Sequence, residues 1–190
     1  MVPAILILTF ATALKNMTST LGAKYFVGDL MSGQAEALGA FLPAIIFVVA
    51  CVLAFATGTS WGTFGVLVPI AVTILGGSGT LTILTVSATL GGAVFGDHIS
   101  PISDTTILAS AGAQCNHVEH VNTQLPYASI VAGISVVAYL VAGATATLGS
   151  VLCCILTWVC ALAVFAGVVF LLRYLESKKP VETATEQEQA

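Results

Sequence analysis

The chain has 190 residues, of which 57% are hydrophobic and only 7% are charged, and its mean hydropathy is +1.03. Soluble domains carry about 25% charged residues, so this composition excludes an ordinary soluble fold and predicts helices that face lipid or one another. The formal net charge is −4, and the sequence lacks the basic stripe that nucleic-acid binding requires. Half of the charged residues lie in the last eighteen positions, which indicates a solvated tail.

Three apolar stretches are long enough to cross a bilayer, which takes about 20 residues. They are residues 38–56, 126–148 and 151–172. The last two are separated by Gly149 and Ser150, so they predict an antiparallel helical hairpin. The remaining apolar stretches, 4–14, 64–75, 80–95 and 105–113, are short or end in glycine and polar residues. Interruptions of this kind are typical of the broken helices that line transporter binding sites.

The most informative interruption lies between residues 96 and 106 and carries two carboxylates, Asp97 and Asp104. An acidic side chain at the bilayer centre costs about 2.5–3.5 kcal/mol, and a bound cation would compensate for that cost. Pro101 removes a backbone donor and clashes with a helical turn, so we expect Gly96 and Pro101 to mark a helix break with open carbonyl oxygens. The candidate ion ligands of this segment are Asp97, Asp104, Ser100, Ser103 and Thr105.

Two residues of this segment have alternative interpretations. Ser103 or Asp104 is placed to cap the helix that follows, so Asp104 could serve only as a cap. His98 could relay protons or sense pH, and it could equally be a packed, hydrogen-bonded histidine.

A second polar interruption spans residues 57–65 and holds four hydroxyls and three glycines. Glycine permits unwound backbone, so Gly58 and Gly62 are the predicted break positions. Thr59, Ser60 and Thr63 are the candidate ion ligands, because hydroxyl and carbonyl oxygens suit alkali cations. Helix packing alone is the competing interpretation, because Gly58 and Gly62 have small-xxx-small spacing.

Other polar segments carry weaker signals. Residues 16–20 could form a third wall of the site or an aqueous loop. His117, Glu119 and His120 could bind zinc, but a closed site needs a further ligand, so a solvated loop is favoured. The five cysteines have neither metal nor disulfide spacing, and we expect no cofactor beyond Na+ and H+ as transported ions.

The run from Gly96 to Thr106, together with the Gly58–Thr63 run upstream, resembles the signature blocks of the NhaC-type Na+/H+ antiporter family. The similarity covers residues 1 to 173 and looks like the C-terminal portion of longer family members. The resemblance implies an all-α, polytopic membrane protein with a re-entrant helical hairpin and discontinuous transmembrane helices, half of an inverted-repeat transporter. It implies a hairpin over 38–75 with residues 57–63 at its tip, and one crossing over 80–113 broken at 97–103.

The function expected is secondary active transport, with Na+ and H+ competing for one carboxylate-centred site, rather than enzymatic catalysis. Relatives that exchange malate for lactate make Na+- or H+-coupled organic-acid exchange an alternative, and a non-autonomous piece of a split transporter is another. An intramembrane aspartyl protease is a remote alternative, because its Gly-x-Gly-Asp signature would need glycine where Val94 stands.

The expected organisation is a membrane domain over residues 1–173 and a charged, disordered tail over 174–190. Arg173, Lys178 and Lys179 place the C-terminus in the cytoplasm by the positive-inside rule, with the chain as a multi-pass protein of the plasma membrane. The lipid bilayer is the first expected partner. A separate chain carrying the N-terminal half and a second copy of this chain are the protein partners considered.

Overall fold

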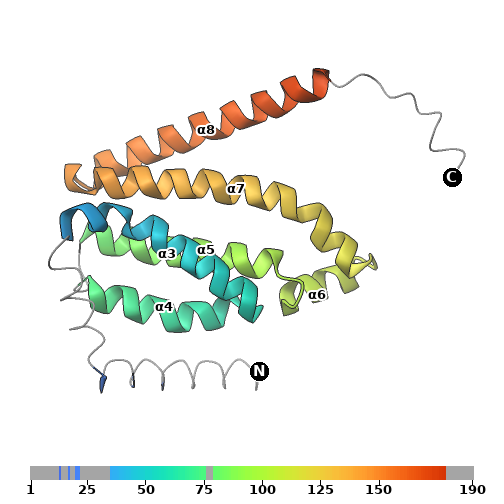
Figure 1. The fold of residues 1–190 in the computed structure, drawn as a ribbon, viewed down its shortest axis with the longest axis horizontal. Coiled ribbons are helices and arrows are strands. Elements are labelled where there is room, and N and C mark those ends of the chain that lie inside the picture. The colour runs from blue at the N-terminus through green and yellow to red at the C-terminus, as the bar shows by residue number, and fades with distance from the viewer. Residues whose placement is uncertain (1–12, 14–16, 18–19, 22–34, 76–78, 179–190) are drawn as a thin grey trace, which may run out of the picture.

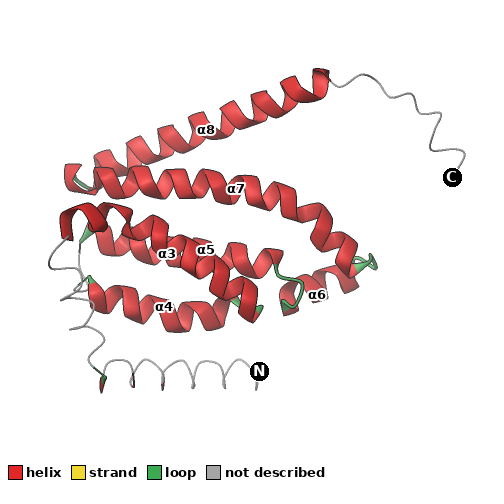
Figure 2. Ribbon diagram, viewed as in Figure 1, coloured by secondary structure: helices red, strands yellow, loops and turns green. Residues whose placement is uncertain are grey.

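The computed structural model of this protein describes residues 13, 17, 20–21, 35–75 and 79–178. Over these residues the regular structure is helical and no strand occurs, which confirms the predicted all-α class (Figure 2). The elements are α3 (Ala35–Thr57), α4 (Ser60–Ile74), α5 (Thr80–Ile99), α6 (Asp104–Gly112), α7 (His117–Thr145), the 3-10 turn η1 (Ala146–Leu148) and α8 (Ser150–Lys178). The expectations for residues 4–14 and 16–20 fall largely outside the described part of the chain.

Four of these helices are long and apolar enough to cross a membrane: Gly39–Thr57, Thr80–Ile99, His117–Leu148 and Ser150–Leu175. Three of them correspond to the predicted spans. The other one, Thr80–Ile99, was expected to stop near residue 95, and this expectation is wrong because α5 continues as a helix to Ile99. The chain over 80–113 does leave the helical path, at residues 100–103 instead of 97–103. The single crossing expected over 80–113 is wrong, because α5 is long enough to span the membrane by itself.

Two of the predicted break positions, Gly96 and Gly62, are wrong because both glycines are helical. At Gly96 the reason is packing. A Cβ added there would lie 2.9 Å from the Cβ of Ala54 and would clash with the carbonyl oxygen of Cys51, so glycine lets α5 approach α3. At Gly62 the reason is capping. The backbone N–H of Gly62 donates to the Thr59 hydroxyl, so α4 has already begun at Ser60.

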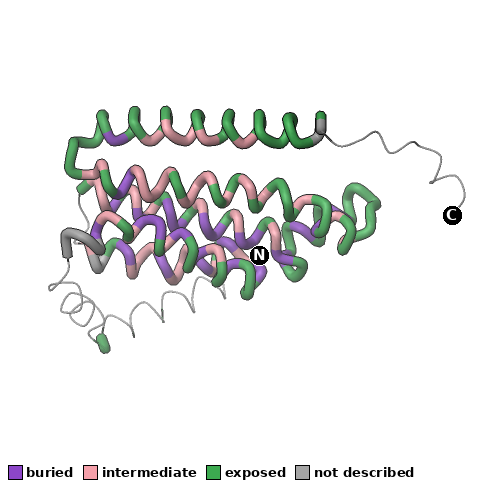
Figure 3. The backbone as a smooth tube through the Cα atoms, turned by 45° about the horizontal axis from the view of Figure 1, so that its top comes forward, coloured by how far each residue is buried: buried purple, intermediate pink, exposed green. Residues whose placement is uncertain are grey.

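The helices form a bundle around α5, which packs against α3, α4 and α7 (Figure 1). Its core uses small side chains, which allow helix backbones to approach closely in membranes. The buried hydrophobic cluster consists of Ala50, Ala54, Leu67 and Ala93. The last helix, α8, packs mainly on α7, and its residues are mostly exposed, with half-buried positions between them (Figure 3).

Helix α7 begins at a side-chain cap and is joined to α8 by a short turn. Gly149, with φ of 97°, joins α7 and η1 to α8, which confirms the predicted hairpin. At the other end, the Asn116 side chain accepts hydrogen bonds from the backbone N–H groups of Val118 and Glu119, so α7 begins at His117. The solvated loop expected over residues 117–120 is therefore wrong. Helix α8 runs on to Lys178, and residues 179–190 lie outside the described part.

Candidate ion-binding site

Asp97 lies in the last turn of α5 and is buried, with 6% of its surface exposed. Three hydroxyl groups surround its carboxylate. Ser103 donates to Oδ1 at 2.7 Å, and Ser60 and Thr105 reach Oδ2 at 3.1 and 3.3 Å. The hydroxyls of Ser103 and Thr105 are themselves 2.7 Å apart. The structure therefore gathers one carboxylate and three hydroxyls, contributed by three helices, into a single polar cluster.

Two helix N-termini meet at this carboxylate. Ser60 is the first residue of α4, and Ser103 occupies the N-cap position of α6. Ser103 or Asp104 was expected to cap α6; Ser103 takes the N-cap position, but its hydroxyl donates to Asp97 and not to the α6 backbone. The N-terminal end of a helix carries a partial positive charge, and both helices place such an end beside Asp97.

The backbone leaves the helical path beside Asp97. Ser100 and Ser103 both have extended conformations, with ψ of 126° and 131°. Between α5 and α6 the chain makes turn hydrogen bonds, from the N–H of Ser100 to the Asp97 carbonyl and from the N–H of Ser103 to the Ser100 carbonyl. The buried Ser100 donates its hydroxyl to the carbonyl oxygen of Phe55 at 2.8 Å, which ties this break to α3. Pro101, predicted as a break position, lies within this segment.

The second break, between α3 and α4, packs directly against the first. Gly58 has φ of 64°, a conformation that favours glycine, and lies beneath Ile102. A Cβ at position 58 would lie 2.8 Å from the carbonyl oxygen of Ile102. The two polar interruptions found in the sequence are thus brought into contact, and Asp97 lies where they meet.

The remaining predicted residues lie around this cluster with other partners. Thr59 caps α4, and the buried Thr63 donates its hydroxyl to the Thr59 carbonyl at 3.0 Å. Asp104 is exposed in the first turn of α6, and within the described residues no hydrogen bond links its carboxylate to the cluster. The structure therefore places Asp97 and Asp104 in different environments.

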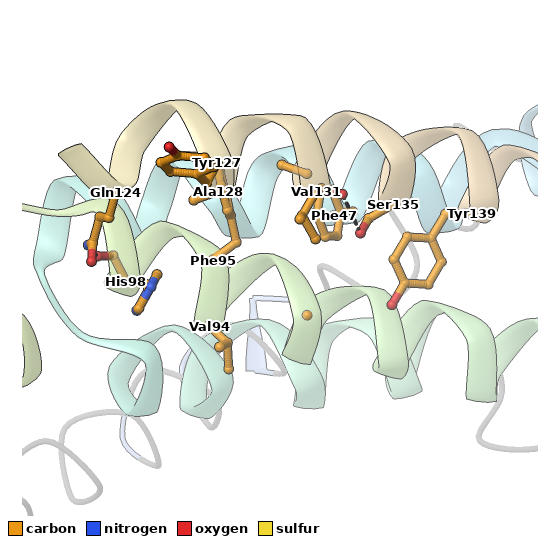
Figure 4. A pocket seen from close by; sticks show the side chains of 12 residues that line it. Phe47, Val94, Phe95, His98, Gln124, Tyr127, Ala128, Val131, Ser135 and Tyr139 are labelled. Atoms are coloured by element: carbon orange, nitrogen blue, oxygen red, sulfur yellow. Dashed lines mark hydrogen bonds between the residues drawn. The ribbon is translucent and has the colours of Figure 1, made fainter. Parts of the chain in front are cut away.

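The side chain of His98 is exposed and lines a pocket of about 550 Å³ between α5 and α7 (Figure 4). Gln124 and Tyr127 lie near His98 at one end, and Tyr139 lies at the other. Aromatic and aliphatic side chains such as Phe95 line much of the wall. Asp97 does not line this pocket, so the two neighbouring titratable residues face different surroundings.

Sequence reasoning missed the side chains that hold the end of α5. The carbonyl oxygen of His98 accepts a hydrogen bond from Thr106 at 3.3 Å and another from the side-chain amide of Gln124. Gln124 is 26 positions away in sequence, so no local pattern could have indicated this contact. The proposed zinc ligands give no metal site, because the described part of the chain contains no group of three His, Cys, Asp or Glu side chains that could hold a metal ion.

Comparison with known proteins identifies the family of this chain. The model of the Na+/H+ antiporter family matches residues 1–144, which include both breaks and all three hydroxyl partners of Asp97. The chain belongs to the Na+/H+ antiporter family. This membership confirms the resemblance found in the sequence.

Several curated proteins are similar over parts of the chain. An uncharacterized protein of Haemophilus influenzae is 46% identical over 75% of this chain and 27% of its own length. The malate-2H+/Na+-lactate antiporter of Bacillus subtilis is 41% identical over 44% of this chain and 18% of its own length. The arginine/ornithine antiporter ArcD of Halobacterium salinarum is 40% identical over 56% of this chain and 23% of its own length.

The chain therefore spans about a quarter or less of the length of these curated relatives. No solved structure matches it.

Proposed function

We propose that this chain forms part of a secondary transporter that exchanges Na+ for H+ at a site centred on Asp97. The observation that carries the proposal is the burial of this carboxylate among three hydroxyls at the meeting point of two helix breaks. Broken helices at membrane depth line ion and substrate sites in transporters, and carboxylate and hydroxyl oxygens are ligands for hard cations.

Competition between the two ions follows from the chemistry of the cluster. Each hydroxyl has one donor and two acceptor lone pairs, so Ser60, Ser103 and Thr105 can donate to Asp97 when the ion is absent and turn lone pairs to Na+ when it binds. Protonation of Asp97 removes the negative charge that holds Na+ and so releases it.

The different environments of the two aspartates support a transporter over a protease. An aspartyl protease needs two carboxylates close enough to share a proton. Here Asp97 is buried among hydroxyls and Asp104 is exposed. We therefore centre the site on Asp97, with Ser100 and Thr63 as structural supports of the two breaks and Asp104 at the periphery.

Exchange coupled to an organic acid is a second candidate function. It is supported by the similarity to the malate-2H+/Na+-lactate antiporter of Bacillus subtilis, which aligns with 44% of this chain. In either case we propose that transport requires the protein length that this chain lacks relative to its relatives. We further propose insertion in the plasma membrane with the C-terminus of α8 in the cytoplasm.

The test is ion exchange in proteoliposomes that contain the chain alone or together with the remaining part of a longer relative. A Na+ gradient should drive proton movement, and Asp97→Asn should reduce the rate by a factor of about 100 or more because the charge that binds Na+ is lost. Asp104→Asn is the matched control and should keep the rate within about threefold. Malate and lactate gradients test the second candidate. Unchanged exchange in Asp97→Asn would reject the carboxylate-centred mechanism.

A further inference from the structure

The break between α5 and α6 leaves carbonyl oxygens that the two helices cannot satisfy by themselves, because the last carbonyls of a helix have no partner within it. Helix α7 supplies donors for two of them. His117 places Nε2 2.7 Å from the carbonyl oxygen of Pro101, and the Gln124 amide donates to the carbonyl oxygen of His98. These two side chains lie seven positions apart on α7, so both project from the same face of that helix.

His117 also contacts α6 through its other ring nitrogen. Nδ1 lies 3.0 Å from the hydroxyl of Ser110, and that hydroxyl is 2.9 Å from the carbonyl oxygen of Ile107. Because the carbonyl oxygen of Pro101 can only accept, Nε2 must carry a proton. One imidazole therefore connects the break segment, helix α6 and the capped N-terminus of α7.

The segment held in this way is the one that delivers hydroxyls to Asp97. Pro101 precedes Ser103 by two residues, and the N–H of Ser103 donates to the carbonyl oxygen of Ser100 at 3.3 Å. Ser103 and Thr105 then reach the carboxylate. A shift of the break would move both hydroxyls, and misplacement by about 1 Å can have large effects on a site of this kind.

We propose that His117 and Gln124 are positioning residues of the ion site: by holding the carbonyl oxygens of Pro101 and His98, they fix the α5–α6 break and thereby the hydroxyl ligands of Asp97. The inference rests on the proposed function at Asp97. Neither residue touches the ion. Their effect on binding passes through the backbone of residues 98–103.

The experiment measures two quantities on the purified full chain, hydrogen–deuterium exchange of residues 99–110 and equilibrium binding of radioactive Na+. His117→Ala should speed exchange at the break by about tenfold, as expected for the loss of a hydrogen bond, and weaken Na+ binding by a similar factor. His117→Gln, which retains an N–H donor, should restore both quantities to within about threefold of the wild type.

His120→Ala is the matched control, because His120 lies one turn further along α7 and its ring makes no hydrogen bond to the break among the residues described. It should change neither quantity. Gln124→Glu removes the amide donor with little change of shape and should act in the same direction as His117→Ala.

Each outcome decides the matter. An unchanged rate of hydrogen–deuterium exchange at the break in His117→Ala would overturn the inference, because the break would not depend on this histidine. Faster hydrogen–deuterium exchange in His117→Ala with unaltered Na+ affinity would also overturn the inference, because His117 would then stabilise the fold without positioning the site. Failure of the wild type to bind Na+, with Asp97→Asn behaving identically, would instead reject the proposed function and the positioning role with it.

Discussion

At the scale of the residue, the side chains that hydrogen-bond to the Asp97 carboxylate are hydroxyl groups. The hydrogen bonds that reach its carboxylate in the described structure come from Ser60, Ser103 and Thr105. An ammonium or guanidinium partner would hold the carboxylate permanently charged and would compete with a transported cation. Hydroxyls can rotate between donating and accepting, so this set of partners suits a residue that must exchange a proton for Na+.

Ser103→Ala tests the shortest of these hydrogen bonds. In the proposed mechanism this hydroxyl turns a lone pair to Na+ when the ion binds, and a polar contact to a charged group contributes about 1.5–3 kcal/mol, so we expect Na+ affinity to fall by about 10- to 100-fold. Ser135→Ala is a suitable control, because the Ser135 hydroxyl donates to the Val131 carbonyl within its own helix. The measurement is equilibrium Na+ binding to both variants, and equal affinities would argue against Ser103 as a ligand.

At the scale of the element, apolar length predicted α3, α7 and α8 because a span needs about 20 apolar residues. The last turn of α5 was not predictable in the same way. Gly96, Asp97 and His98 have the composition of a helix end, yet they continue the helix because α3 packs on Gly96 and distant hydroxyls satisfy Asp97. Ser60 lies 37 positions from Asp97 in the sequence, and the α3 residues that pack on Gly96 are also distant, so a local pattern cannot show these contacts.

The sequence did identify the chemical components of the site. Asp97, Ser60, Ser103 and Thr105 were all predicted as ligands, because carboxylates and hydroxyls between apolar half-helices are unusual and costly in a membrane. What remained hidden was the support from α7. The polar stretch that holds His117, Glu119 and His120 was interpreted as a loop. The contacts of His117 to Pro101 and Ser110 could not be predicted, because they depend on how α7 folds back over α6.

Gly96→Ala tests the contact between α3 and α5. The added methyl group would clash with the Cys51 carbonyl and crowd Ala54, and overpacking of this kind costs about 1–3 kcal/mol. We expect a lower unfolding temperature in detergent. Gly133→Ala is the control, because a Cβ there meets nothing within 4 Å and alanine favours a helix by up to about 1 kcal/mol. If both variants had the same unfolding temperature, close α3–α5 packing would not be the reason for glycine at position 96.

At the scale of the whole molecule, the buried polar cluster lies at the joined breaks, whereas α8 stands at the periphery of the bundle (Figure 1). None of the most apolar part of α8 is buried in this chain. Apolar helix surface of this kind faces lipid or other membrane helices.

The orientation of α8 gives a prediction at this scale. Arg173 and the following lysines favour a cytoplasmic end, so a cysteine introduced by Ser177→Cys should react with a membrane-impermeant maleimide in inside-out vesicles. It should remain unlabelled in right-side-out vesicles until they are permeabilised. Labelling is scored as the increase over the wild type, which carries five native cysteines. The reverse pattern would place the C-terminus outside the cell.

The most direct test of Na+ and H+ competition at Asp97 is proton release on Na+ binding, measured in a weakly buffered solution of the purified chain. Ligands that must be deprotonated release protons when a cation binds. We predict that Na+ releases protons from the wild type and from Asp104→Asn, and releases none from Asp97→Asn. Equal release from the wild type and Asp97→Asn, or Na+ binding to the wild type without any release across the pH range, would contradict a shared carboxylate.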